Sequence, residues 1–415
     1  MIQSPTRGER VSAYAWLVFA LTFGLLISDY MARQVLSAVF PLLKTQWNLS
    51  DSQLGLLSGV VAAAVGLLTV PVSLLANRVG RVKSIFAMAV LWSIATLVCG
   101  LAATYGQMLA ARVLVGIGEA AYGSVGIAVI ISVFPARLRA TLTGAFMAGG
   151  LAGQVLGVAV GGVVASTYGW RVAFMAIGGA GLLLALIYPL VVREARLRRE
   201  ANENRPQVRL ADVGALFTGR ALCSAYAGSG LQLFVAAAIP AWLPTYFVRY
   251  YDLPLKPATS LAALFLGIGG AGMIMCGMIS DKLRLSSKHL ALLSASYCVG
   301  CALAVAGAFM APPGTLQLVL LGIGMFLAAA SAGPAGAIVA RLTPAVLHGT
   351  AFAVLTLANN AFGLAPGPIV TGWVADRIGL LGAMQWLPLA SLAGAAVFLI
   401  GAQDFAKEPR PPVTA

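Results

Sequence analysis

The segment RVLVGIGE, residues 112–119, decides how this chain folds, because a close variant of it, LVLLGIGM, recurs at residues 318–325. The two copies lie 206 positions apart (318 minus 112), and each stands inside a long apolar run. The segment that begins at Pro135 recurs in a similar way at Pro344. A repeat of about half the chain length predicts a protein built from two related halves.

The solvent around most of this chain is expected to be a lipid bilayer. Of its 415 residues, 60% are apolar and only 10% are charged, and the mean hydropathy is +0.91. A soluble domain carries about 25% charged residues, so this chain cannot cover itself with a hydrated surface. The 47 glycines suit helices that approach one another closely in lipid.

Twelve apolar stretches approach the length of about 20 residues that a membrane-spanning helix needs. Their apolar character is continuous rather than alternating, which predicts helices and not membrane strands. The fold class is therefore an all-α polytopic membrane protein with two six-helix bundles. We expect an N-terminal bundle (1–192), a cytoplasmic linker (193–220) and a C-terminal bundle (221–415). The predicted spans lie near residues 12–40, 53–76, 84–103, 108–134, 139–165, 171–192, 221–250, 257–281, 287–310, 315–341, 347–373 and 381–402.

The net charge of +14 is unevenly distributed over the loops. Twenty Lys and Arg fall on the side of the termini and five on the opposite side. An excess of these residues marks cytoplasmic loops, so both termini are predicted to be cytoplasmic, in a bacterial inner (plasma) membrane. A nucleic-acid-binding face would gather its charge on one surface, and no nucleic acid partner is expected.

Charged residues inside the spans are rare. The four that stand well inside them are Asp29, Arg33, Arg112 and Glu119. A charge at the centre of a membrane helix costs about 2.5–3.5 kcal/mol and normally faces a partner or a water-filled cavity. At the positions of Arg112 and Glu119 the second half has Leu318 and Met325. We expect the ionic chemistry to be confined to the first half.

Glu119 and Asp29 are the candidates for proton coupling. Burial favours the neutral form of a carboxyl group and a nearby arginine favours the ionised form, a balance that suits a group whose protonation changes during transport. The alternative is a static ion network that locks the first and fourth spans together. Arg33 and Arg112 are candidates for binding an anionic substrate, because a guanidinium group binds carboxylate or phosphate through two hydrogen bonds.

Further polar and aromatic side chains inside the spans are candidate substrate-binding residues: Tyr30, Tyr122, Gln154, Gln232, Trp242, Tyr246, Asn359 and Asn360. Trp242 and Tyr246 stand beside prolines of the seventh span and suit either a gate or a pair of interfacial anchors. Asn359 and Asn360 suit either the site or hydrogen bonds between helices.

Glycines recur at every fourth position of the fifth span, from Gly149 to Gly161. The corresponding part of the eleventh span contains Gly363, Pro366 and Pro368, which weaken a helix. We expect these two spans to slide or bend, and static packing is the alternative.

The segment SLLANRVGRVK, residues 73–83, resembles the signature G-x-L-a-D-R-x-G-R-K that the major facilitator superfamily carries between its second and third spans. The segment at 112–118 is similar to that superfamily's fourth-span signature, R-x-x-x-G-x-G. The resemblance implies a substrate site between two bundles that alternate in access. It also implies a conformational latch made of Asn77, Arg78, Gly80, Arg81 and Asp281. Asn77 replaces the acidic residue of the signature, and Asp281 keeps it in the second half.

Within the superfamily the chain resembles the Spinster-type transporters. The likeness is carried by residues 29–33, 111–122, 134–139 and 169–174. The first of these reads DYMAR where the family shows N-Y-x-D-R, so that Ala32 replaces the family's Asp and Asp29 lies one turn earlier. The resemblance implies coupling roles for Glu119 and Arg112, and lysolipids or sphingoid lipids as substrates.

The sequence thus predicts a monomeric secondary transporter that uses a proton gradient, needs no cofactor and exports an amphiphilic or lipid-like compound. Proton-coupled uptake of a small organic anion held by Arg33 and Arg112 is the alternative, and a non-transporting receptor or a channel is the alternative from another class. An enzyme is not expected, because the only histidines, His289 and His348, stand near helix ends and no metal or nucleophile cluster appears. No P-loop for ATP is present.

Overall fold

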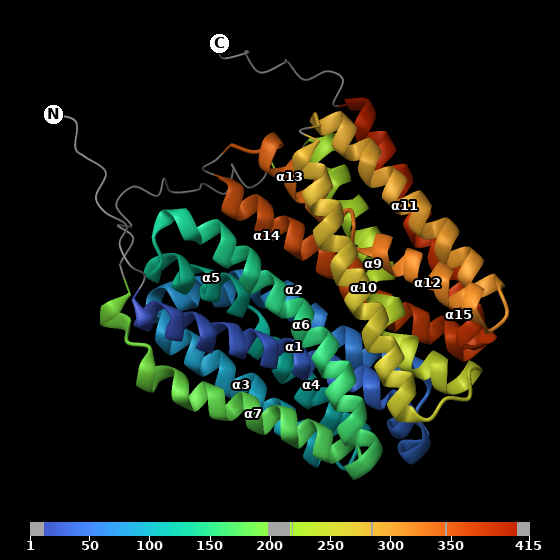
Figure 1. Cartoon of the computed structure of the whole chain (residues 1–415), viewed down its shortest axis with the longest axis horizontal. Coiled ribbons are helices and arrows are strands. Elements are labelled where there is room, and N and C mark those ends of the chain that lie inside the picture. The colour runs from blue at the N-terminus through green and yellow to red at the C-terminus, as the bar shows by residue number, and fades with distance from the viewer. Residues whose placement is uncertain (1–11, 198–215, 218, 284, 345–346, 405–415) are drawn as a thin grey trace.

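The computed structural model of the chain describes residues 12–197, 216–217, 219–283, 285–344 and 347–404. The regular elements in these ranges are all helical (Figure 1). Eleven helical stretches there are long and apolar enough to cross a membrane, and the last, His348–Asp404, is 57 residues long. Gly379 interrupts it with a φ of 80°, so it contains two crossings. The chain is an integral multi-pass membrane protein with the twelve spans that the sequence predicts.

The helices form two bundles, coloured blue to green and yellow to red in Figure 1. The first contains α1 (Ala13–Trp47), α2 (Asp51–Val79), α3 (Arg81–Leu101), α4 (Tyr105–Glu119), α5 (Tyr122–Val133), α6 (Ala136–Tyr168) and α7 (Trp170–Val191), followed by the short 3-10 helix η1 (Glu194–Arg196). The second contains α9 (Arg220–Tyr250), α10 (Leu255–Lys282), α11 (Ser287–Met310), α12 (Thr315–Ala328), α13 (Ala332–Leu342), α14 (His348–Asn359), the π-helical turn η3 (Asn360–Leu364) and α15 (Pro366–Asp404). Most of the expected linker, residues 198–215, lies outside the described residues.

The fourth and tenth spans are each broken, although the sequence predicted continuous helices there. In the first bundle α4 ends at Glu119 and α5 begins at Tyr122. The break in the second bundle falls between α12 and α13 and begins three residues later in the repeat, because α12 ends at Ala328 and Glu119 matches Met325. A broken helix leaves backbone carbonyls without partners, which is costly inside a membrane. The hydroxyl of Thr69 in α2 donates to the carbonyl of Ala120 at 2.7 Å and satisfies one of them.

The glycines of the fifth span pack against α1 of the same bundle. A Cβ added at Gly153 would come within 2.7 Å of the Ile27 carbonyl oxygen, and one at Gly157 would come within 2.9 Å of the Met31 backbone. In this conformation the stripe thus holds two helices of one bundle together, as in the static-packing alternative, and sliding or bending stays a prediction. The neighbouring Gly162 is different, because it meets Thr259 of α10 in the second bundle.

The two bundles converge at the end opposite the termini and diverge toward the termini (Figure 1). At the converging end α2 lies against the eleventh span with backbone in contact. Gly55 and Gly59 of α2 sit directly on the carbonyl oxygens of Pro368 and Ala365. Any side chain at either glycine would separate the bundles, so this end of the molecule is closed.

Candidate substrate and proton site

An ion pair joins α1 to α4 in the middle of the first bundle. Arg33 donates from Nε, at 3.0 Å, and from Nη2, at 2.6 Å, to the same oxygen of Glu119, Oε2. The side chain of Glu119 is fully buried, whereas that of Arg33 is 21% exposed. The second carboxyl oxygen, Oε1, is buried and has no hydrogen-bond partner of the usual donor kind. One oxygen of this carboxyl group is thus bonded to the arginine, and the other has no partner.

Asp29 completes a cluster of three charges with this pair. It is buried one turn before Arg33 on α1. Its Oδ1 and the Oε1 of Glu119 are both buried, and neither has a hydrogen-bond partner in the described part of the chain. Each of the two acids thus keeps one buried oxygen without a partner.

Arg112 is fully buried and faces backbone rather than a carboxylate. It donates to the carbonyl oxygens of Leu57 at 3.2 Å, Ala32 at 3.0 Å and Arg33 at 3.3 Å. These bonds fasten α4 to α1 and α2. A substrate cannot reach a side chain of 0% exposure, so the predicted contact between Arg112 and substrate does not exist in this conformation.

A cavity of about 180 Å³ lies between the bundles, beside the charged cluster. It is lined by Tyr30, Arg33, Gln34, Ser58, Ala62 and Gln154 of the first bundle and by Ala236, Ala237, Pro240, Ala241, Leu364 and Pro368 of the second. Gln34 donates to Gln154 at 3.2 Å, and the Arg33 guanidinium lies 5.3 Å from the centre of the Tyr30 ring. The structure therefore brings three of the predicted residues, Tyr30, Arg33 and Gln154, to one cavity. The sequence analysis did not predict Gln34 and Ser58, because the sequence alone does not show whether a polar residue in a span faces the cavity or another helix.

Four other predicted residues lie outside the cavity lining. Tyr122 is buried and donates to the carbonyl of Thr22 at 2.6 Å. Gln232 and Asn360 are buried, and they donate to backbone carbonyls of α12 and α14. Asn359 neighbours Asn360, and its Oδ1 is buried without a partner. A role of these four residues in binding stays a prediction.

Trp242 and Tyr246 are 0% and 1% exposed, so the interpretation as interfacial anchors is wrong. Trp242 donates to the carbonyl of Pro368, which lines the cavity, and its ring lies 5.2 Å from that of Phe40 in the first bundle. The hydroxyl of Tyr246 accepts from Gln317 at 2.8 Å. Trp242 thus stands between the bundles beside the cavity, where a closed gate is expected.

A network of charges, which the sequence analysis did not predict, ties the bundles together at the closed end. Asp51, at the start of α2, accepts from Arg249 of α9 at 2.7 and 2.9 Å and from Lys44 of α1 at 2.6 Å. Asp376 of α15 accepts from the backbone N–H groups of Asp51 at 2.7 Å and Ser52 at 2.9 Å. We call these five residues the end clamp.

The end clamp combines two favourable effects. Hydrogen bonds between ionised partners are shorter and stronger than neutral ones. A carboxylate at a helix N-terminus is further stabilised by the helix dipole and by the N–H groups that have no partner within the helix. Because Arg249 and Asp376 belong to the second bundle, both effects hold the bundles together.

The predicted latch residues make their described contacts within the first bundle. Gly80 links α2 to α3 with a φ of 106°, which favours glycine. Glu194 of η1 accepts from the backbone N–H groups of Arg81 at 3.0 Å and Val82 at 2.7 Å. The side chain of Arg81 donates to the carbonyl of Ala128 in α5. Glu194 is a further residue that the sequence analysis missed.

For Arg78 and Asp281, the described part of the chain shows no contact that joins the bundles. Arg78 and Asp281 are exposed at the ends of α2 and α10 that lie toward the termini. The side chain of Asn77 lies outside the described residues. The latch therefore stays a prediction for a conformation in which these helix ends approach.

Two six-helix bundles around a central polar cavity define a class, the membrane transporters that alternate between two sides. Residues 22–368 match the Major Facilitator Superfamily, and the chain belongs to this superfamily. The resemblance found in the sequence is confirmed, and the chain is a transporter and not an enzyme.

Relatives and solved structures agree with this assignment. The chain is 26% identical over 403 residues to the probable L-galactonate transporter of Escherichia coli (strain K12), covering 91% of this chain and 86% of that one. It is 29% identical over 241 residues to protein spinster homolog 1 of Xenopus laevis, covering 56% of this chain and 46% of that one. The fold is similar, with a TM-score of 0.84 and 22% identity, to an inward-facing, unoccupied crystal structure of a bacterial homolog of the human lysosomal transporter Spinster, covering 98% of this chain and all of that one.

Proposed function

We propose that this chain is a proton-coupled secondary transporter of a small organic anion. The observation that carries the proposal is the state of Arg33. Among the described residues that line the cavity, Arg33 is the only arginine or lysine. Its guanidinium group is bonded to the carboxyl group of Glu119. A substrate anion and the Glu119 carboxylate therefore compete for the same guanidinium group.

Protonation decides this competition. When a proton binds to Glu119, the carboxyl group becomes neutral and its attraction to Arg33 falls. Arg33 then turns its hydrogen bonds to the anionic group of a substrate in the cavity. When the proton leaves, the ionised Glu119 forms its ion pair with Arg33 again, and the substrate is released. Proton and anion thus travel in the same direction, and an inward proton gradient drives uptake.

The end clamp closes one side of the cavity, and alternating access requires that it open. With the predicted orientation, in which both termini are cytoplasmic, this conformation is closed to the outside. Opening to the outside requires that Arg249 and Asp376 leave α2. The bundles would then rock about the centrally placed cavity, as in transporters built from two repeats.

The size of the cavity favours a small substrate. Its volume of about 180 Å³ is below the roughly 300–1,000 Å³ of sites that hold drug-sized ligands. The galactonate transporter, which moves a small organic anion by its name, matches over most of both chains. A small anion therefore replaces the lipid-like compound as the first candidate substrate.

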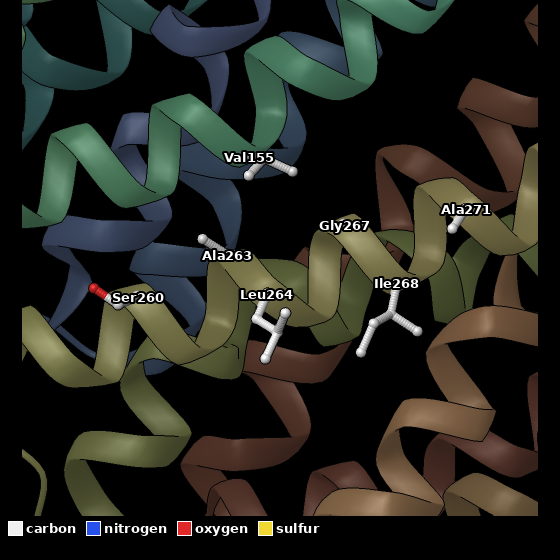
Figure 2. A pocket seen from close by; sticks show the side chains of 7 residues that line it. All are labelled: Val155, Ser260, Ala263, Leu264, Gly267, Ile268 and Ala271. Carbon is white, nitrogen blue, oxygen red and sulfur yellow. The ribbon is translucent and has the colours of Figure 1, made fainter.

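Export of an amphiphilic compound is the second candidate, because an apolar groove of about 470 Å³ lies between α6 and α10. Figure 2 shows Val155 of α6 facing the stretch of α10 from Ser260 to Ala271. These helices belong to different bundles, so a lipid tail could enter between them.

The test is proton-driven uptake into sealed vesicles that contain the purified protein. A pH gradient is imposed, and accumulation of labelled benzoate and glucuronate is measured. Glu119→Gln keeps the shape of the protonated acid but cannot lose a proton. We expect it to accumulate neither anion above empty vesicles, while exchange of an anion across the membrane without a gradient persists.

Asp252→Asn is the matched control, since Asp252 is an exposed acid in a loop and Asn tolerates its φ of 50°. This variant should respond to the gradient as the unmodified protein does. Gradient-driven accumulation that survives in Glu119→Gln would refute the proposed coupling.

A further inference from the structure

We infer that the substrate is a compact monocarboxylate with an apolar body, of the size of an aryl carboxylate, and not a polyhydroxylated sugar acid. The inference rests on the proposed function and names the substrate class of the same cavity. It is carried by the difference between the two walls of that cavity.

The wall from the first bundle is polar and cationic. Arg33 supplies the charge, and the amides of Gln34 and Gln154 and the hydroxyls of Tyr30 and Ser58 supply hydrogen-bonding groups. The wall from the second bundle is entirely different. Its residues are three alanines, two prolines and a leucine: Ala236, Ala237, Ala241, Pro240, Pro368 and Leu364. These side chains neither donate nor accept hydrogen bonds.

A polyhydroxylated acid does not fit between such walls. Its hydroxyl groups point to all sides, and those against the second bundle would lose their hydrogen bonds to water. Each such loss lowers affinity by about five- to 150-fold. An aryl ring or short alkyl chain loses no hydrogen bond there and gains from leaving water. A site built to select hydroxylated substrates places polar partners where the hydroxyls fall.

Backbone chemistry orients the substrate further. Pro240 and Pro368 have no N–H group, so neither can donate to the carbonyl four residues earlier in its helix. Those carbonyls belong to Ala236 and Leu364, which both line the cavity. Carbonyl oxygens carry a partial negative charge and repel a carboxylate. The carboxylate therefore faces Arg33, and the body of the molecule faces the second bundle.

The experiment compares benzoate with glucuronate as labelled substrates in the vesicle assay with an imposed pH gradient. We expect benzoate uptake to exceed glucuronate uptake at least tenfold, and benzoate alone to raise the unfolding temperature of the detergent-solubilised protein. Proton-coupled uptake of glucuronate in preference to benzoate would overturn this inference and leave the proposed function standing. If neither anion moves with protons, both fail.

A variant of the apolar wall gives a second readout. Ala236→Ser adds a hydroxyl group at a half-buried position of the lining. We expect the ratio of benzoate to glucuronate uptake to fall about fivefold, the value of one regained hydrogen bond. Ala221→Ser, in the first turn of the same helix and outside the lining, should leave the ratio unchanged. An unchanged ratio in Ala236→Ser would contradict the assigned wall.

Discussion

The two bundles share a plan of six spans and differ in the chemistry of their interiors. The first holds Asp29, Arg33, Arg112 and Glu119 at its centre. In the second, the buried polar side chains Ser229, Gln232 and Ser391 are all neutral. Protonation can therefore change the energy of one bundle while the other offers an unchanging surface. The two repeats therefore share their arrangement of helices but not the charged residues at their centres.

The largest expected effect comes from removing the buried cation of the first bundle. Arg112→Leu gives it the residue that the second bundle has at the equivalent position, Leu318. The three carbonyl oxygens, which lie inside helices, then lose their bonds to Arg112, and hydrogen bonds to a charged group contribute about 1.5–3 kcal/mol each. We expect the free energy of unfolding to fall by about 3–5 kcal/mol, measured by denaturation in detergent.

Leu318→Met is the matched control for this comparison, because it changes an apolar side chain of the second bundle for another of similar volume. Its unfolding should change by less than about 1.5 kcal/mol. Equal stability of Arg112→Leu and the unmodified protein would show that the bundles do not differ in the way described.

The reverse exchange places the acid of the first bundle in the second. Met325 is 3% exposed, and the buried polar side chains described in the second bundle are neutral, so none offers the cation that Arg33 offers Glu119. Met325→Glu should therefore destabilise the protein by about 2–3 kcal/mol, because a buried ionisable group without a partner must be desolvated. Thermal unfolding measures the loss. Met325→Gln, which cannot ionise, should lose less stability than Met325→Glu. An equal loss of stability in both variants would mean that the shape of the new side chain, and not its charge, causes the effect.

The smallest expected effect tests the end clamp, which joins the bundles rather than distinguishing them. Asp376→Asn keeps the shape but removes the charge that faces the start of α2. We expect the closed end to lose about 1–2 kcal/mol, which raises the outward-open population roughly five- to thirtyfold. Distances between spin labels at the start of α2 and at the turn of α15 near Gly379 measure the shift.

Arg377→Gln removes the neighbouring charge, which lies over the exposed ring of Trp373 and not in the clamp. Its distance distribution should match that of the unmodified protein. A closed end that stays fully populated in Asp376→Asn would remove Asp376 from the clamp.

The sequence predicted the architecture because hydropathy and the repeat act over whole helices. Twelve spans and the superfamily follow from them, and both are confirmed. The site was harder, because helical spacing shows which residues of one helix share a face but not what lies across from them. Asp29 and Arg33 stand one turn apart in the sequence, yet the partner of Arg33 is Glu119, 86 positions away.

The end clamp shows the same limit more strongly. Its bond from Asp51 to Asp376 joins residues 325 positions apart, and each acid alone looks like an ordinary polar residue at a span end. The break after Glu119 was missed because Ala120 and Ala121 are good helix formers, and the surrounding packing overrides that preference.

The glycine stripe of α6 has a mechanical consequence. From Gly149 to Gly161, over about 18 Å at 1.5 Å per residue, α6 rests on α1 almost backbone to backbone. Two helices fastened in this way resist both twisting and shear, so α1 cannot absorb a change at Asp29 or Arg33 by flexing on its own. Under the proposed function, a change in the protonation of Glu119 would therefore move α1 and α6 together as one rigid unit.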